Sequence, residues 1–149
     1  MWSRSRSAEN DPDDGFTLIE LLVVIIIIGI LAAIAIPLLT SQRKKAVSAA
    51  QRSDLRNAST AFETYYSDYT AYPDTLSQTA GTTTVSISSG ANPSATFYVS
   101  KGDTVSLMPS TGSSGAVKDG SYCVKSVNPD SNDTWYYDSD AGGIVTACQ

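Results

Sequence analysis

Residues 21–39 read LLVVIIIIGILAAIAIPLL, a run of nineteen residues with no charged side chain and no side chain that forms hydrogen bonds. As a helix this run would be about 28 Å long, close to the roughly 30 Å thickness of the hydrocarbon core of a bilayer. The rest of the chain is rich in Ser, Thr, Gly and Asp, so it lacks the apolar surface needed to surround such a helix in a soluble core. The run therefore predicts a helix that spans a membrane.

Charge is unevenly distributed around this run. The chain of 149 residues has ten Lys and Arg against fifteen Asp and Glu, and its net charge is −5. Five of the bases lie between Arg43 and Arg56, whereas residues 57–149 carry nine acids and three Lys. This balance argues against nucleic acid as the main partner. The chain has no His, which excludes every mechanism that uses imidazole as a base or a metal ligand.

Two general interpretations of the N-terminus are possible. In a secretory signal peptide, residues 33–35 (Ala-Ile-Ala) would be the cleavage site, although the apolar run continues beyond them to Leu39. In a plain signal anchor, the run would hold an extracellular binding module on the membrane. Neither interpretation gives a role to the residues that directly precede the run.

Those residues form a distinctive pattern. Residues 15–20 read Gly-Phe-Thr-Leu-Ile-Glu, and the apolar run follows at once, with Pro37 near its far end. A Gly, an aromatic residue, a Glu four residues later, an uninterrupted apolar helix and a late Pro together closely resemble a type IV prepilin. This family also includes the pseudopilins of type II secretion and competence systems. The resemblance covers residues 13–45 and implies a structural subunit, not an enzyme.

The resemblance implies a processing site. A prepilin peptidase would cut between Gly15 and Phe16, remove the leader peptide 1–15 and methylate the new amine of Phe16. The precursor would lie in the inner (cytoplasmic) membrane as a single-pass protein with its N-terminus in the cytoplasm, and the pilus assembly machinery would move it to a cell-surface pilus. The leader departs from the family because residues 11–14 (Asp-Pro-Asp-Asp) are acidic, where the family is often basic.

Glu20 is the candidate assembly residue. A charge in the middle of a membrane costs roughly 2.5–3.5 kcal/mol, so intramembrane charges are usually paired and functional. Glu20 lies one helical turn after Phe16, on the same face. The resemblance implies that Glu20 of one subunit meets the Phe16 amine of a neighbour in a helical homo-oligomeric filament; pairing with its own N-terminus is the alternative. Pro37 also belongs to this assembly segment, and it predicts a kink or local opening near residues 33–37.

The charges on either side of the span and the family resemblance predict opposite orientations in the membrane. Two Lys and Arg precede it and five follow within seventeen residues, so the positive-inside rule places the C-terminus in the cytoplasm. The resemblance requires the acidic domain outside. We follow the motif because the two Cys indicate an oxidising compartment. We then expect the bases at 43–45 to reach the outer headgroups of membrane lipid before assembly.

The remainder predicts an α+β fold, in which a long N-terminal helix packs on a small antiparallel β-sheet. Residues 40–72 continue the helix as an amphipathic half, with apolar and aromatic residues such as Phe62 and Tyr65 at three- and four-residue steps. Their spacing predicts a seam against a sheet. Residues 73–149 form a β-rich globular part, with strands expected at 83–88, 96–100, 104–108, 121–127, 134–138 and 144–147.

Cys123 and Cys148 lie near the C-terminus, and many pilins close a C-terminal loop with one disulfide. We expect such a bond here, worth roughly 3 kcal/mol in the chain-entropy model. Two free thiols or a metal site are the alternatives. The acids Asp130, Asp133, Asp138 and Asp140 do not have the spacing of an EF-hand loop and predict a solvated turn instead of a calcium site.

No catalytic triad, phosphate-binding Gly loop or cofactor motif is present in the sequence. We therefore predict no enzyme activity, no cofactor and no metal. The first functional prediction is the major pilin of a bacterial type IV pilus, which polymerises through its N-terminal helix, residues 16–69. Residues 16–39 are the transmembrane and assembly part of that helix. The alternatives are a pseudopilin of a type II secretion or competence system and a signal-anchored extracellular binding module.

Overall fold

The computed structural model describes residues 16–108, 117–118 and 120–148. The chain divides into two compact units, Met1–Leu39 and Thr40–Gln149. The predicted leader 1–15, including Gly15, lies outside the described residues. Within the described part, the first unit holds the apolar part of a long helix, and the second holds the rest of that helix and every strand.

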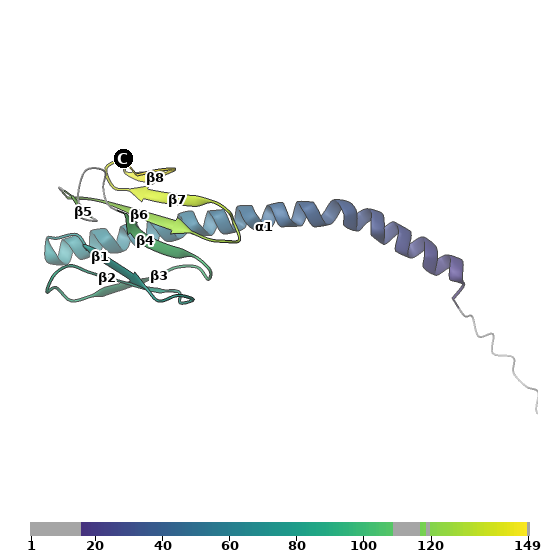
Figure 1. Ribbon diagram of the computed structural model, residues 1–149, viewed down its shortest axis with the longest axis horizontal. Helices are drawn as coiled ribbons and strands as arrows, with labels where there is room; N and C mark the ends of the chain where they lie inside the picture. The colour runs from purple at the N-terminus through teal and green to yellow at the C-terminus, as the bar shows by residue number, and fades with distance from the viewer. Residues whose placement is uncertain (1–15, 109–116, 119, 149) are drawn as a thin grey trace, which may run out of the picture. The chain divides into compact units, whose positions relative to one another are not determined.

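The helix α1 extends over Leu18–Tyr69 (Figure 1). It ends where Thr70 adopts a left-handed backbone conformation with φ of 52°, and the Thr70 amide donates to the carbonyl of Tyr66 at 2.7 Å. A left-handed residue directly after the last turn is a common way for a helix to stop. The helix continues through Pro37, so the local opening predicted near residues 33–37 does not interrupt it.

Residues of α1 in the first unit are almost entirely exposed. Every large apolar side chain from Leu18 to Leu39 is at least 47% exposed. Among the described residues, α1 is the helix that is long and apolar enough to cross a membrane by length and composition.

Among the described residues, eight strands follow the helix, and they form two antiparallel sheets. The first has the order β1-β2-β3, and the second has the order β4-β6-β7-β8 with β5 paired to β6. The strands are β1 (Thr75–Gln78), β2 (Thr84–Ser88), β3 (Ala95–Tyr98), β4 (Thr104–Met108), β5 (Val117–Lys118), β6 (Ser121–Val127), β7 (Thr134–Asp138) and β8 (Gly143–Val145).

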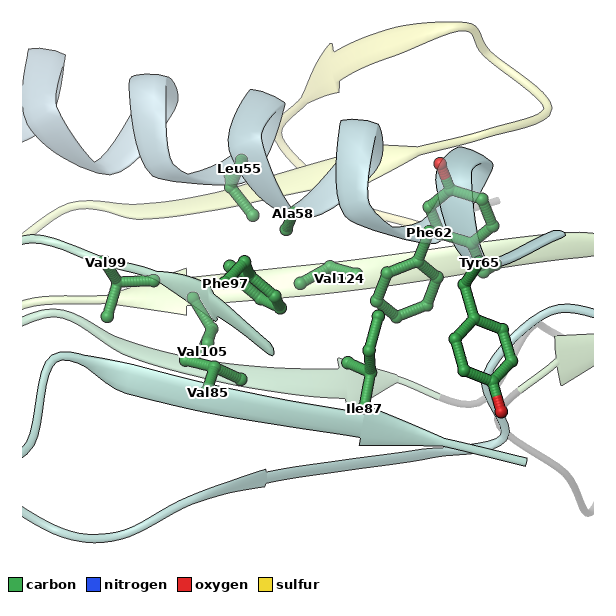
Figure 2. Packing of buried hydrophobic residues seen from close by; sticks show 11 residues of the cluster. Leu55, Ala58, Phe62, Tyr65, Val85, Ile87, Phe97, Val99, Val105 and Val124 are labelled. Atoms are coloured by element: carbon green, nitrogen blue, oxygen red, sulfur yellow. The ribbon is translucent and has the colours of Figure 1, made fainter. Parts of the chain in front are cut away.

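One core joins the second half of α1 to both sheets. Leu55, Ala58, Phe62 and Tyr65 recur at three- and four-residue steps, and each is at most 1% exposed. Figure 2 shows these helix side chains directed toward the strands, which confirms the predicted seam. The strands contribute Val85, Ile87, Phe97, Val105, Tyr122 and Val124 to the core, and Val99 joins them from directly after β3.

The side chain of Gln78 connects the two sheets. Its amide nitrogen donates to the carbonyl of Asp103 at 2.9 Å, and its amide oxygen accepts from the Val105 backbone at 2.9 Å. The amide thus takes the place of a backbone partner at the start of β4. Gln78 also donates to the carbonyl of Thr82 at 2.9 Å, which fixes the turn that follows β1.

The α+β class with a long helix packed on antiparallel strands is confirmed, and the described strands divide between two sheets. Two short strands were not expected. β1 is a polar four-residue strand, and bonds from the Thr75 hydroxyl to Ser88 support its pairing with β2. β5 has two residues and exists through its pairing with β6. The sequence of such a short strand gives little indication of its structure, because the neighbouring strand stabilises it.

Candidate assembly site

The N-terminus of α1 is closed by a reciprocal pair of hydrogen bonds between Thr17 and Glu20. The Thr17 amide donates to Glu20 Oε2 at 2.9 Å, and the Glu20 amide donates to Thr17 Oγ1 at 3.3 Å. The Thr17 hydroxyl donates to the same Oε2 at 2.6 Å. This arrangement is a capping box, which satisfies backbone donors that the first turn of a helix leaves without partners.

The capping box determines which part of the Glu20 carboxylate is occupied. The bonds from Thr17 end on Oε2, and no described residue donates to Oε1. Thr17 and Glu20 both lie after the predicted cleavage position, so the box belongs to the processed chain as well. Phe16, the residue directly before the cap, is 86% exposed. A carboxylate with one occupied oxygen can accept a further charged donor through its other oxygen.

The exposed apolar part of α1 requires a covering environment. Contiguous apolar surface of this size is unusual on a soluble monomer and marks contact with lipid or with other protein. Glu20 is the single charged side chain of residues 16–39. Pro37 lies near the other end of this segment and cannot donate a backbone hydrogen bond to the carbonyl of Ala33.

In the second unit, the β6–β7 loop and β7 hold the helix through polar contacts. Gln51 donates to the carbonyl of Asp133 at 3.2 Å and accepts from the Ser131 hydroxyl at 2.7 Å. Trp135 Nε1 donates to the hydroxyl of Ser48 at 2.9 Å. The Arg52 guanidinium lies 5.0 Å from the centre of the Trp135 ring, within the range of a cation–π contact.

Cys123 and Cys148 form a disulfide with a Cα–Cα distance of 6.1 Å. Cys123 is a buried residue of β6, and Cys148 follows β8. The closed loop therefore contains β7 and β8, which are the last strands of the second sheet. The bond attaches the C-terminal segment to a central strand of that sheet.

Two of the four acids near the C-terminus, Asp130 and Asp138, have local structural roles. Asp130 pairs with Arg43 at 3.1 Å. The Asp138 carboxylate accepts from the amide of Asp140 at 2.9 Å and so shapes the turn after β7. Among the described residues, no three His, Cys, Asp or Glu side chains come together as a metal site.

A buried carboxyl pair connects α1 to the turn between β3 and β4. Asp54 of α1 accepts from the Ser100 amide at 2.6 Å and from the Ser100 hydroxyl at 3.2 Å. Asp103 is 2% exposed; its Oδ1 accepts from Asn128, and its Oδ2 has no hydrogen-bond partner among the described residues. Burial, together with the neighbouring Asp54, raises the pKa of Asp103 to about 6, whereas the Asn128 bond opposes this shift.

A second polar cluster lies at the other end of the helix–sheet contact. The Tyr122 hydroxyl donates to Glu63 Oε1 at 3.0 Å, and the Tyr72 hydroxyl donates to Glu63 Oε2 at 3.0 Å. Burial, reinforced by the Glu63 carboxylate, raises the pKa of Tyr72 to about 12 and raises the pKa of Tyr122 above its ordinary value. Both phenols therefore stay protonated and hold Glu63 at neutral pH.

A capped apolar helix with one carboxylate, continued by a half that packs on antiparallel sheets, defines the class of prepilin-like subunits. The family comparison agrees, because residues 12–36 match the family described as "Prokaryotic N-terminal methylation motif". In this N-terminal segment, the chain is similar to the prepilin family of type IV pilins and pseudopilins, which are structural subunits.

Three relatives illustrate the match. The Type II secretion system core protein G of Pseudomonas aeruginosa is 41% identical over 61 residues, which is 41% of this chain and 43% of the relative. The protein of the same name from Escherichia coli is 40% identical over 65 residues, or 44% and 45% of the two chains. The Type IV major pilin protein PilA of Myxococcus xanthus is 40% identical over 65 residues, or 44% of this chain and 30% of the relative. The match thus spans less than half of each of these relatives.

Sequence reasoning placed Glu20 at the start of the helix but missed its partner. The pattern Thr-Leu-Ile-Glu at residues 17–20 has the spacing of a capping box, and this signal would have identified Thr17. The buried pair of Asp54 and Asp103 had no comparable signal. These residues are distant in the sequence, and only the packing of α1 against the β3–β4 turn brings them together.

Proposed function

We propose that this chain is a filament-forming subunit, the major pilin of a type IV pilus, which polymerises through residues 16–39 and presents its disulfide-closed domain on the outside. The observation that carries this proposal is the exposed apolar part of α1 with Glu20 as its single charge. Helices of this kind bury their surface against lipid before assembly and against one another afterwards. The precursor is a single-pass protein of the inner membrane.

Processing prepares the assembly step. A prepilin peptidase cuts between Gly15 and Phe16, and this cleavage turns the neutral amide nitrogen of Phe16 into a positive amine. The peptidase then methylates that amine. In the separate subunit, the bonds from Thr17 stabilise Glu20 at the edge of the membrane. In the filament, the Phe16 amine of a neighbouring subunit donates to the remaining oxygen of Glu20. A pairing of opposite charges in an apolar interior is strong, and it sets the register of the helices.

The capping role and the pairing role of Glu20 can be separated by substitution. Glu20→Gln keeps an oxygen that accepts from Thr17 but removes the negative charge. Thr17→Ala removes the hydroxyl that accepts from the Glu20 amide but leaves the charge of Glu20 in place. We expect Glu20→Gln to be processed normally and to form no filaments, and Thr17→Ala to be processed and to assemble.

The experiment expresses each variant in a host whose own pilin gene is deleted and scores processing by immunoblot and sheared filaments by electron microscopy. Normal filaments from Glu20→Gln would show that the charge is not needed for assembly. Loss of filaments in both variants would show that assembly also needs the Thr17 cap, and the charge of Glu20 would then not be the sole requirement.

A pseudopilin of a type II secretion system is the second candidate. The names of the relatives from Pseudomonas aeruginosa and Escherichia coli favour it. The matched segment of 61–65 residues is also shared with a major pilin, so the match is compatible with both. Long surface fibres at native expression support a pilin, whereas restored secretion in a strain that lacks its core protein G supports a pseudopilin.

A further inference from the structure

A short stretch of α1 is exposed on every side. Residues 40–46 are all exposed, and Ser48 is the first buried residue of the helix. Seven helical residues extend over about 10 Å. Within this stretch, Arg43, Lys44 and Lys45 are consecutive, and we call these three residues the basic collar.

The bases of the collar project from more than one face of the helix. Consecutive residues of an α-helix are about 100° apart around its axis, so the three bases cover about 200° of its circumference. A folded protein partner meets one face of a helix, whereas a layer of lipid headgroups meets it all round. Arg52 illustrates the one-sided case, because it stacks on the Trp135 ring and donates to the carbonyl of Ser48.

One base of the collar is already neutralised. Arg43 pairs with Asp130 of the β6–β7 loop at 3.1 Å, and both side chains are largely exposed, at 74% and 59%. In the described part of the chain, neither Lys44 nor Lys45 forms an ion pair. The collar therefore offers two uncompensated positive charges, and Asp130 adds a negative charge that opposes the approach of an anion.

We propose that the basic collar binds the phosphate groups of anionic phospholipids, such as phosphatidylglycerol, and that the pair of Arg43 and Asp130 weakens this binding. The inference rests on the proposed placement of residues 16–39 in a membrane, since the collar begins four residues after the apolar run ends. The three bases rise over about 4.5 Å of helix, which fits a headgroup layer of roughly 5–7 Å on each side of the hydrocarbon.

The test uses the full chain in a non-ionic detergent. Native mass spectrometry measures the binding of short-chain phosphatidylglycerol and phosphatidylcholine, and the ratio of the two affinities is the readout. A base near an anionic surface contributes about 1 kcal/mol, which is about a five-fold change in affinity. We expect Lys44→Gln to reduce the ratio about five-fold, and Lys44→Gln with Lys45→Gln to reduce it about twenty-five-fold.

Arg56→Gln is the matched control, because it removes one positive charge from the same helix twelve residues further on, about 18 Å along the axis. Its ratio should equal that of the unmodified chain. Asp130→Asn should raise the ratio a few-fold, since it removes the negative charge beside Arg43. An unchanged ratio in Asp130→Asn would show that the pair of Arg43 and Asp130 does not weaken lipid binding.

Equal affinity for the two lipids, or an equal loss in Arg56→Gln and Lys44→Gln, would overturn the proposal. Displacement of the lipid by inorganic phosphate at the same concentration would show that the collar binds a soluble anion and is not specific for lipid headgroups. The readout is independent of filament formation. Absent filaments with an intact lipid preference would count against the proposed function alone, and filaments without a preference would count against the collar alone.

Discussion

Asp103 gives the domain a stability that depends on pH in an unusual direction. Its carboxyl is 2% exposed, and Oδ2 accepts no hydrogen bond from the described residues. A proton on this oxygen allows Asp103 to donate to the carboxylate of Asp54, and burial raises the pKa of Asp103 from 3.8 to about 6. Between these two values the folded chain binds more protons than the unfolded chain. The free energy of unfolding therefore falls as the pH rises through this window.

The substitution Asp103→Asn isolates this effect. The amide oxygen takes the place of Oδ1 and keeps the bond from Asn128, while the amide nitrogen takes the place of Oδ2 and donates toward Asp54. The variant carries no ionisable group at this position. A pKa shift of about two units corresponds to about 3 kcal/mol, so the variant should match the unmodified chain near pH 3.5 and exceed its stability by up to about 3 kcal/mol at pH 7.

The assay is urea denaturation of residues 16–149, without the predicted leader, in a non-ionic detergent between pH 3.5 and 7, with the disulfide intact. Trp135 reports on the contact between β7 and α1, and it is the single tryptophan of a chain that begins at Phe16. Asp133→Asn removes an exposed carboxylate and serves as the control. A stability difference between Asp103→Asn and the unmodified chain that stays constant with pH would show that Asp103 does not titrate in this window.

Three further substitutions probe contacts that hold the second unit together, each by denaturation of the full chain. Cys148→Ser opens the disulfide loop and should lower the free energy of unfolding by about 3 kcal/mol, and the same loss should follow reduction of the unmodified chain. Gln78→Ala leaves the Val105 amide and the Asp103 carbonyl without their shared partner and should cost about 3 kcal/mol; a loss below 1 kcal/mol would show that the sheets do not depend on this side chain. Tyr122→Phe removes a buried hydroxyl bonded to Glu63 and should cost about 1–2 kcal/mol, with no loss expected from Tyr98→Phe on the exposed face of β3.

The elements with strong patterns could be predicted from the sequence. The apolar run and the three- and four-residue spacing through Phe62 and Tyr65 predict α1. Short runs of β-favouring residues, bounded by turn residues, predict β2, β4, β6 and β7 close to their observed bounds. The pattern of residues 15–20 also identified the class, because it combines a Gly-Phe pair with a carboxylate that is costly at the start of an apolar helix unless it has a partner.

The parts that depend on long-range contacts could not be predicted. The two sheets are connected by Gln78, whose amide bonds the Asp103 carbonyl and the Val105 amide, and no local preference of that residue reveals this contact. The pKa of Asp103 likewise arises from the packing of three segments around one carboxyl group. By contrast, the bond between Thr17 and Glu20 is local, and its four-residue pattern was present in the sequence.

Processing between Gly15 and Phe16 is the step on which the proposed function depends, and the mass of the mature N-terminal peptide is the decisive measurement. The chain is purified from membranes of a host with an active prepilin peptidase and digested, and the N-terminal peptide is sequenced by mass spectrometry. We predict a peptide that begins at Phe16 and carries one methyl group on its amine. A peptide that begins at Met1 or at Ile36 would contradict the proposal, since these results indicate a plain anchor and a secretory signal.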